Sequence, residues 1–213
     1  MNNSVQYRIF HNDAAPLTCL SGAALLVMAS DRLAHAITVT GALVWVFGLS
    51  SLAAHAGARI FPRQGKTALL AFITSFFAGL YLLLLWILSP LCAIESFFVI
   101  SVIPMFCMVS GILKQMESMI LEDGFFASCS EALILGALIV ILAFIREPFG
   151  FLSLSLPGGA QGTVLLFSFK TEAFLPIRLI ASSAGALLLL GYFLGLYRHF
   201  KTQYRLRGGK DGF

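Results

Sequence analysis

Two short segments of the sequence place a cysteine three residues after a proline, with a Ser-Gly pair close behind. The first is Pro16–Gly22 (PLTCLSG), which contains Cys19, and the second is Ser101–Glu117 (SVIPMFCMVSGILKQME), which contains Cys107. Cysteine is the residue type here that could do chemistry, because its thiolate binds metals. We expect any chemical centre to lie where the two segments meet. The alternative is structural, since buried cysteine is also common as a small apolar residue.

The two remaining cysteines, Cys92 and Cys129, lie near the ends of apolar segments, and we interpret them as packing residues. The sequence has no Cys-x-x-Cys pair and no His/Cys cluster at zinc-finger spacing, so it indicates neither a disulfide framework nor a zinc site. The run Pro157–Gly162 lacks the Gly-Lys-Ser/Thr ending of a phosphate loop and predicts a turn. No nucleophile has a base beside it. We therefore expect no complete active site in this chain.

The elements that position these cysteines are predicted to be membrane helices. Of the 213 residues, 59% are hydrophobic and 11% are charged, with a mean hydropathy of +0.91. That is too little charge to solvate a globular surface. The net charge of +4 would suggest nucleic acid as the partner of a soluble protein. Here Lys and Arg lie between and after apolar runs, so membrane orientation explains them better, and we expect no nucleic-acid binding.

Six apolar segments predict an all-α, polytopic membrane protein with six transmembrane helices in a single domain, residues 1–213. The segments are Ala14–Ser30, Leu33–Ala58, Thr67–Leu88, Phe97–Leu113, Phe125–Ile145 and Leu179–Tyr197. The first has about 17 residues, the lower limit for a span. Its Val-Met-Ala ending also resembles a signal-peptide cleavage site, but five further apolar segments make a retained helix equally natural.

The connections between the segments carry the turn and boundary signals. We expect a short turn around Glu95, and an abrupt end of the fifth helix at Arg146–Pro148, because proline cannot continue a helix. Phe149–Ala173 reads as a long connection that lies partly at the membrane interface. A basic tail follows from Arg198, and its end is expected to fray.

Lys and Arg are distributed unequally between the two sides of a six-helix arrangement. The side of the termini has ten: Arg8, Arg59, Arg63, Lys66, Lys114, Arg198, Lys201, Arg205, Arg207 and Lys210. The other side has four: Arg32, Arg146, Lys170 and Arg178. Because cytoplasmic loops are enriched in Lys and Arg, both termini are predicted to be cytoplasmic.

Three plus three helices also predict an internal repeat. A duplicated unit with an odd number of helices inserts upside down relative to its copy, which gives an inverted repeat with a site at the midplane. The halves would be about 14–91 and 97–197, with a cytoplasmic tail at 198–213. The two Pro-x-x-Cys segments then belong to the first helix of each half.

At this point the chain resembles the RnfE/NqrD family of membrane subunits of the Rnf and Nqr redox complexes. The resemblance rests on Asn12, Ile103-Pro104, Glu117 and Asp123-Gly-Phe125, and it runs along most of the chain. Its most specific piece is Arg146-Glu147 followed by Gly150. The sixth apolar segment with its basic tail completes the pattern.

The resemblance implies a subunit of an ion-translocating oxidoreductase in the bacterial inner membrane. Such a subunit pairs with a homologous, oppositely oriented RnfA/NqrE-like subunit and assembles with flavin and Fe–S proteins of the complex. Each of the two contributes one cysteine from its first and one from its fourth helix. The four thiolates hold an iron–sulfur cluster that relays electrons across the membrane, and a low-dielectric shell tunes its potential.

The cysteines of this chain depart from the family pattern. In ungapped alignment the first family cysteine falls on Ala23 and the second on Ser110. Cys19 and Cys107 each lie roughly one helical turn before those positions. Either small shifts let Cys19 and Cys107 serve as ligands of a shared iron–sulfur cluster, or this protein lacks the usual cluster.

Other charged residues and other functions stay open at this stage. Glu131 is either a functional group at membrane depth or a solvated residue at the interface. Arg146-Glu147 either clamps a neighbouring subunit or forms an exposed ion pair at a helix end, worth about 1 kcal/mol or less. His35 is explained by a membrane-boundary position. As alternatives to the redox subunit, the chain is a small inverted-repeat transporter or channel subunit that binds a solute at Pro-broken helices, or a structural scaffold.

Overall fold

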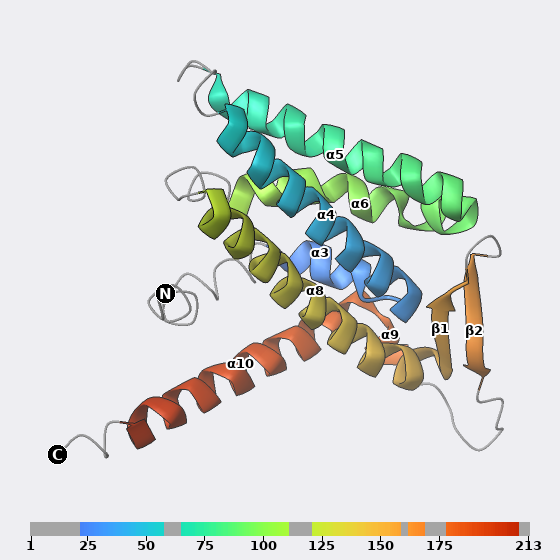
Figure 1. Ribbon diagram of the computed structural model, residues 1–213. Helices are drawn as coiled ribbons and strands as arrows, with labels where there is room; N and C mark the ends of the chain where they lie inside the picture. The colour runs from blue at the N-terminus through green and yellow to red at the C-terminus, as the bar shows by residue number, and fades with distance from the viewer. Residues whose placement is uncertain (1–21, 58–64, 111–120, 159–161, 169–177, 209–213) are drawn as a thin grey trace.

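The computed structural model describes residues 22–57, 65–110, 121–158, 162–168 and 178–208 (Figure 1). The helices in this part of the chain are α3 (Ala23–Ala29), α4 (Leu33–Gly57), α5 (Lys66–Leu88), α6 (Pro90–Ser110), α8 (Leu121–Phe151), α9 (Arg178–Ala181) and α10 (Ser183–Gly208). Two strands, β1 (Ser153–Pro157) and β2 (Thr163–Ser168), pair antiparallel. The fold is therefore mostly helical, with one small hairpin that the all-α prediction did not include.

Four helices, α4, α5, α6 and α8, are long and apolar enough to cross a bilayer. The predicted segments Leu33–Ala58 and Thr67–Leu88 agree with α4 and α5 to within a residue at each end. The predicted first segment begins outside the described residues, and α3 covers only its later part. The sixth divides into α9 and α10, and the apolar part of α10, Ser183–Leu196, is shorter than a span. Six spans and an inverted repeat remain predictions.

Helices α4 and α8 pack closely along their lengths because glycines remove side chains at their contacts. At Gly136 of α8 the side chain of Thr40 occupies the place that a Cβ would take. At Gly48 of α4 a Cβ would lie 3.3 Å from the ring of Phe125. Small residues that let helix backbones approach are typical of membrane bundles. The core of the bundle forms around this pair and α6, with fully buried side chains including Leu43, Phe47, Ile100, Ile103 and Ile139.

Helices α5 and α6 are joined by a single residue, Ser89. The amide of Ser89 donates to the carbonyl of Leu85 (2.7 Å), and its own carbonyl accepts from Ala93 (3.0 Å). Pro90 is the first residue of α6, where its missing N–H costs nothing because that amide has no partner within the helix. The predicted turn around Glu95 is therefore wrong: Glu95 lies within α6. This helix also continues through Pro104, so it is not the broken helix that the solute-binding alternative requires.

The prediction that the fifth helix ends at Arg146–Pro148 is also wrong. Helix α8 continues through Pro148 to Phe151 and ends where Leu152 adopts a left-handed conformation (φ 51°). The amide of Leu152 donates to the carbonyl of Pro148 at 3.2 Å, as in a helix-terminal turn. Pro148 removes one main-chain hydrogen bond from the last turns, and the tertiary contacts of the two preceding residues hold the helix in place.

The hairpin lies within the predicted connection Phe149–Ala173. Pairing of β1 with β2 places the reversal of direction at the predicted Pro157–Gly162 turn, where the amide of Gly158 donates to the carbonyl of Gly162 (2.7 Å). Leu154 and Leu156 of β1 pack against the helical core. In Figure 1 the two strands lie at the right-hand end of the bundle, beyond the end of α8 and near the α5–α6 turn.

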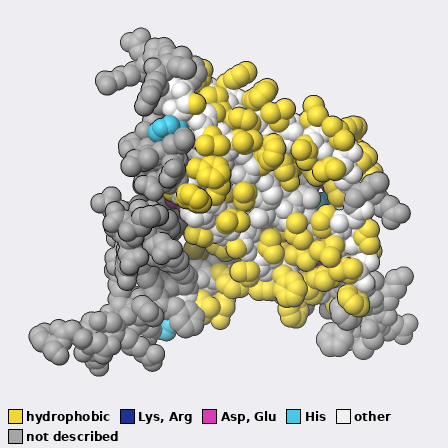
Figure 2. Space-filling model, in the orientation of Figure 1, with side chains coloured by type: hydrophobic (Ala, Val, Ile, Leu, Met, Phe, Trp, Pro, Cys, Tyr) yellow, Lys and Arg dark blue, Asp and Glu magenta, His cyan; other side chains and the backbone are white. Residues whose placement is uncertain are grey.

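The outer surface of the bundle is strongly apolar. Hydrophobic side chains cover much of the face that Figure 2 shows. Exposed large side chains on α5 and α6 include Phe72, Phe76, Leu83, Ile87, Phe97, Phe98 and Met105. A soluble monomer rarely exposes so large an apolar area, and a lipid bilayer covers it naturally. The protein is accordingly a membrane protein. The predicted basic tail from Arg198 is helical up to Gly208, as the last part of α10.

Candidate functional site

Arg146 and Glu147, near the C-terminal end of α8, are the most deeply buried charged side chains in the described part of the chain. Arg146 is 3% exposed and Glu147 is 1% exposed. Burial of a charge is costly unless hydrogen bonds and an opposite charge replace its hydration. The partners of these two residues therefore decide what the site does.

The guanidinium of Arg146 makes four hydrogen bonds and one ion pair, which together engage all three of its nitrogens. The partners are the carbonyl of Ile180 (Nε, 3.1 Å), the carbonyl of Val27 (Nη1, 3.1 Å), the hydroxyl of Ser30 (Nη1, 3.2 Å), the carbonyl of Ala181 (Nη2, 2.6 Å) and the carboxylate of Asp31 (Nη2, 3.1 Å). The carbonyls belong to the last turns of α3 and α9, where a helix leaves its carbonyls without intrahelical partners. One side chain thus caps two short helices and ties both to α8.

Whereas Arg146 caps the ends of helices, Glu147 caps the beginning of a helix, α4. Its Oε2 accepts a hydrogen bond from the main-chain amide of Leu33 at 2.8 Å. Leu33 is the first residue of α4, so its amide is one of the four that no helical carbonyl reaches, and a negative charge there is favourable. The other oxygen, Oε1, is buried and has no hydrogen-bond partner among the described residues.

Gly150 and Ser182 complete the contact between α8 and the α9–α10 joint. A Cβ at Gly150 would lie 3.0 Å from the Cα of Ala181 and 3.1 Å from its nitrogen, so a larger residue requires the two backbones to move apart. Ser182 separates the two helices: its hydroxyl donates to the carbonyl of Leu179 (2.6 Å) and accepts from the amide of Gly185 (3.3 Å). The second contact is an N-cap of α10.

We call Arg146, Glu147, Gly150 and Asp31 the interlock. It overturns the expectation of an exposed ion pair at a helix end, because Arg146 and Glu147 are buried and contact different elements. Because four hydrogen bonds and the ion pair with Asp31 engage all three nitrogens of Arg146, the guanidinium is held by the protein's own groups. The interlock is a positioning device, which holds the ends of α3, α4 and α9 against α8.

A second polar group joins α4 to α5 and α6. His35 Nε2 lies 3.1 Å from Glu95 Oε2, and the hydroxyls of Thr38 and Ser96 lie 3.2 Å apart. Tyr81 donates its hydroxyl to the carbonyl of Thr38 at 2.9 Å. His35 was explained above by a membrane-boundary position alone, but it also pairs with an acid of the neighbouring helix.

The candidate ligand Cys107 is buried in α6, with 1% of its surface exposed, as part of the core cluster. The other candidate, Cys19, lies outside the described residues, as does the side chain of Ser110. Ala23 is half-buried at the start of α3 and packs against the core. Helix α3 contacts α6. The first Pro-x-x-Cys segment lies outside the described residues, so its meeting with the second segment stays a prediction.

An iron–sulfur cluster needs about four thiolates. In the described part of the chain no three His, Cys, Asp or Glu side chains lie together as a metal group. Cys107 offers a thiol in a low-dielectric surrounding, but the chain's own residues cover it. Of the two proposed ligands, the described residues include one, Cys107, and they do not make a cluster site by themselves. No electron-transfer step through a cluster follows from them.

Glu131 is half-buried on α8. Its Oε2 atom is buried and has no hydrogen-bond partner among the described residues. This burial does not match the interpretation of Glu131 as a solvated interfacial residue. Cys129, two residues earlier, is also half-buried and lines an apolar groove of about 530 Å³ between α4 and α8, together with Trp45 and Phe125.

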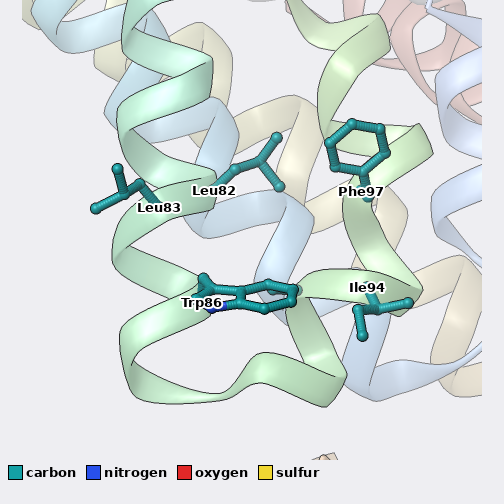
Figure 3. Close-up of a pocket in the computed structure, with 6 residues that line it drawn as sticks. Leu82, Leu83, Trp86, Ile94 and Phe97 are labelled. Carbon is teal, nitrogen blue, oxygen red and sulfur yellow. The ribbon is translucent and has the colours of Figure 1, made fainter.

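A second groove, of about 470 Å³, lies between α5 and α6 (Figure 3). Trp86 and Leu82 of α5 and Ile94 and Phe97 of α6 line it, so its wall is almost entirely apolar. Such a wall offers no acid, base or nucleophile. It suits a lipid chain or an apolar side chain.

Sequence reasoning recognised Arg146-Glu147-Gly150 as distinctive but missed what the three residues do. The partners are mostly main-chain atoms of distant residues, which leave no residue-type signal in the sequence. In comparisons with models of known protein families and with curated proteins, the chain has no match, so the resemblance to the RnfE/NqrD family stays a prediction from the residues.

Proposed function

We propose that this chain is a membrane subunit of an ion-translocating oxidoreductase complex of the Rnf/Nqr type. Its role is to line the transmembrane electron path at an interface with a homologous RnfA/NqrE-like subunit. The catalysis belongs to the assembled complex, with its flavin and Fe–S proteins. Both termini face the cytoplasm of a bacterial cell.

The observation that carries the proposal is the interlock. Arg146, Glu147 and Gly150 are the most specific residues of the resemblance, and in this chain they hold four helices together at one end of the bundle. A motif with so many buried partners depends on the whole fold. Proteins that share the motif at the same place are therefore expected to share the fold, although the fold alone does not assign the redox role.

The apolar surface and the approach of α3 to α6 support the subunit role. The bundle exposes many large hydrophobic side chains on α5, α6 and α8 that its own core does not bury. Such a surface is expected of a subunit that contacts lipid and other membrane proteins. The contact of α3 with α6 is compatible with a site that the two cysteine segments share. A cluster there requires that residues covering Cys107 move aside or that the partner replaces them.

The test is purification of the complex from native membranes in mild detergent through a tag on this chain. We expect a homologous membrane subunit and flavin proteins to co-purify, and the preparation to contain iron with an EPR signal after reduction. Purification of the chain alone, without flavin or homologous subunit, would overturn the proposal.

The same preparation tests separately whether Cys19 and Cys107 bind the cluster. Cys19→Ala and Cys107→Ala are expected to lose the cluster signal. Cys92→Ala is the matched control, because Cys92 is also buried in α6 (2% exposed) and is not a proposed ligand. If both ligand variants keep the signal, Cys19 and Cys107 are not ligands, whereas membership of the complex is decided separately by co-purification.

A further inference from the structure

The outer strand of the hairpin, β2, carries apolar side chains on both of its faces. Four consecutive residues, Val164–Phe167, are each between 38% and 63% exposed. Cross-strand partners share a face of a sheet. Phe167 pairs with Leu154 and Val164 pairs with Leu156, whereas Leu165 pairs with Ser155. A bulge at this step makes Leu166 the extra residue of β2. A hairpin in water would normally have one polar face, and this one does not.

The chain around the hairpin is also free of charge. No Asp, Glu, Lys or Arg occurs between Glu147 and Lys170. Exposed edge strands of soluble proteins usually carry charges, particularly lysine, which prevent pairing with other chains. The absence of such residues from β2 indicates that its surroundings are not bulk water.

The position of the hairpin places it at the boundary of the membrane-spanning bundle. A Cβ at Gly162, just before β2, would lie 2.9 Å from the Cβ of Leu91 in the first turn of α6. The neighbouring end of α5 exposes Trp86, Ile87 and Leu88, a tryptophan beside strongly apolar residues. Tryptophan is enriched where a bilayer meets water. Strand β2 therefore begins beside the first turn of α6, at the end of the bundle where α5 and α6 meet (Figure 1).

The open edge of β2 limits how deep the strand can lie. The sheet has two strands, so the outer edge of β2 presents N–H and C=O groups without a strand to pair with among the described residues. In the hydrocarbon core such groups would lack hydrogen-bond partners. At the level of the lipid headgroups, water and ester oxygens satisfy them, while neighbouring acyl chains contact the apolar side chains.

We infer that the β1–β2 hairpin is a membrane-interface element, whose strand β2 lies in the boundary between lipid headgroups and acyl chains. This inference is independent of the redox role proposed above. A strand from another protein, paired to the open edge of β2, is the competing occupant that the experiment must separate.

The experiment uses single-tryptophan variants of the full chain reconstituted in phosphatidylcholine vesicles. In a Trp45→Phe/Trp86→Phe background, Leu165→Trp and Phe167→Trp report the two faces of β2, and Val164→Trp substitutes for Phe167→Trp if that variant does not fold. Phe76→Trp, exposed in the middle of α5, is the deep control, and Arg32→Trp, an exposed charged position at the same end of the bundle, is the water control. Helix content by circular dichroism verifies folding.

We expect lipids brominated near the glycerol end to quench both β2 reporters about threefold more than Arg32→Trp, and lipids brominated at the chain ends to quench them less than Phe76→Trp. Iodide in the aqueous phase should quench the β2 reporters less than Arg32→Trp. Iodide quenching equal to that of Arg32→Trp would place the hairpin in water. Protection of both reporters from iodide and from brominated lipid would mean that protein covers β2. Lipid quenching of one reporter alone would restrict lipid contact to one face of the strand. Each of these three results overturns the inference.

Discussion

Glu147 accepts a hydrogen bond at 2.8 Å from the main-chain amide of Leu33, a residue 114 positions earlier in the chain. The contact joins the last part of α8 to the first residue of α4. The adjacent residue, Arg146, donates hydrogen bonds to carbonyls in the last turns of α3 and α9. An acid thus caps a helix start, and a base caps two helix ends, as the polarity of helix termini favours.

Replacement of Arg146 should destabilise the protein strongly. Arg146→Gln is expected to lower the free energy of unfolding by about 3 kcal/mol, because buried carbonyls lose a charged donor. Arg146→Lys keeps the charge but has three donors on one nitrogen, so a loss of about 2 kcal/mol is expected. The measurement is equilibrium unfolding in mixed micelles, followed by circular dichroism.

Arg32→Gln is the matched control for this series. Arg32 is exposed one residue before α4, so its replacement should change the unfolding free energy by about 0.5 kcal/mol or less. Equal effects of Arg146→Gln and Arg32→Gln would show that the interlock does not stabilise the fold.

Glu147→Ala should cost about 2–4 kcal/mol, because it removes the cap of α4 and leaves a cavity. Glu147→Gln keeps an acceptor for the Leu33 amide and is expected to lose about 1 kcal/mol. Glu95→Ala is the matched control. The side chain of Glu95 is 39% exposed, so loss of its contact with His35 should cost about 1 kcal/mol or less. If Glu147→Gln proves as harmful as Glu147→Ala, the hydrogen bond to Leu33 is not the source of the stability.

Gly150→Ala should weaken the contact between α8 and α9. The added Cβ would meet the backbone of Ala181 at 3.0–3.1 Å, and backbone cannot move aside as a flexible side chain does. We expect a loss of about 1–3 kcal/mol in the unfolding assay. Gly191→Ala in α10 meets no atom within 4 Å and should instead gain up to about 1 kcal/mol from helix propensity. A stabilising Gly150→Ala would contradict the close approach of the two helices.

The orientation in the membrane can be tested with protease sites in intact spheroplasts. A site inserted between Gly158 and Gly162 is expected to be cut from outside, whereas a site after Gly208 is expected to be protected. The physical reason is the excess of Lys and Arg on the side of the termini. The opposite pattern of cleavage would reverse the proposed orientation.

The sequence by itself determined the membrane helices. Long apolar runs in α4 and α5 predict spans directly, because the hydrocarbon thickness fixes the length of apolar helix that is needed. It also located the distinctive residues Arg146, Glu147 and Gly150. One prediction from proline was wrong: Pro148 lies inside α8, because tertiary contacts compensate for the lost main-chain hydrogen bond in its last turns. Pro90 stands at the first position of α6, where a missing amide matters little.

Only the tertiary structure decided what Arg146 and Glu147 do and that a hairpin forms. The main-chain atoms that Arg146 and Glu147 contact come from Val27, Leu33, Ile180 and Ala181, which are distant in sequence. All residues have a main-chain carbonyl, and all except proline have a main-chain N–H, so residue types in the sequence do not indicate such contacts. The hairpin lacks alternation of apolar and polar residues, because both faces of β2 are apolar and a bulge interrupts the period of two. Local sequence signals therefore specified the spans, and long-range main-chain contacts specified how their ends are held together.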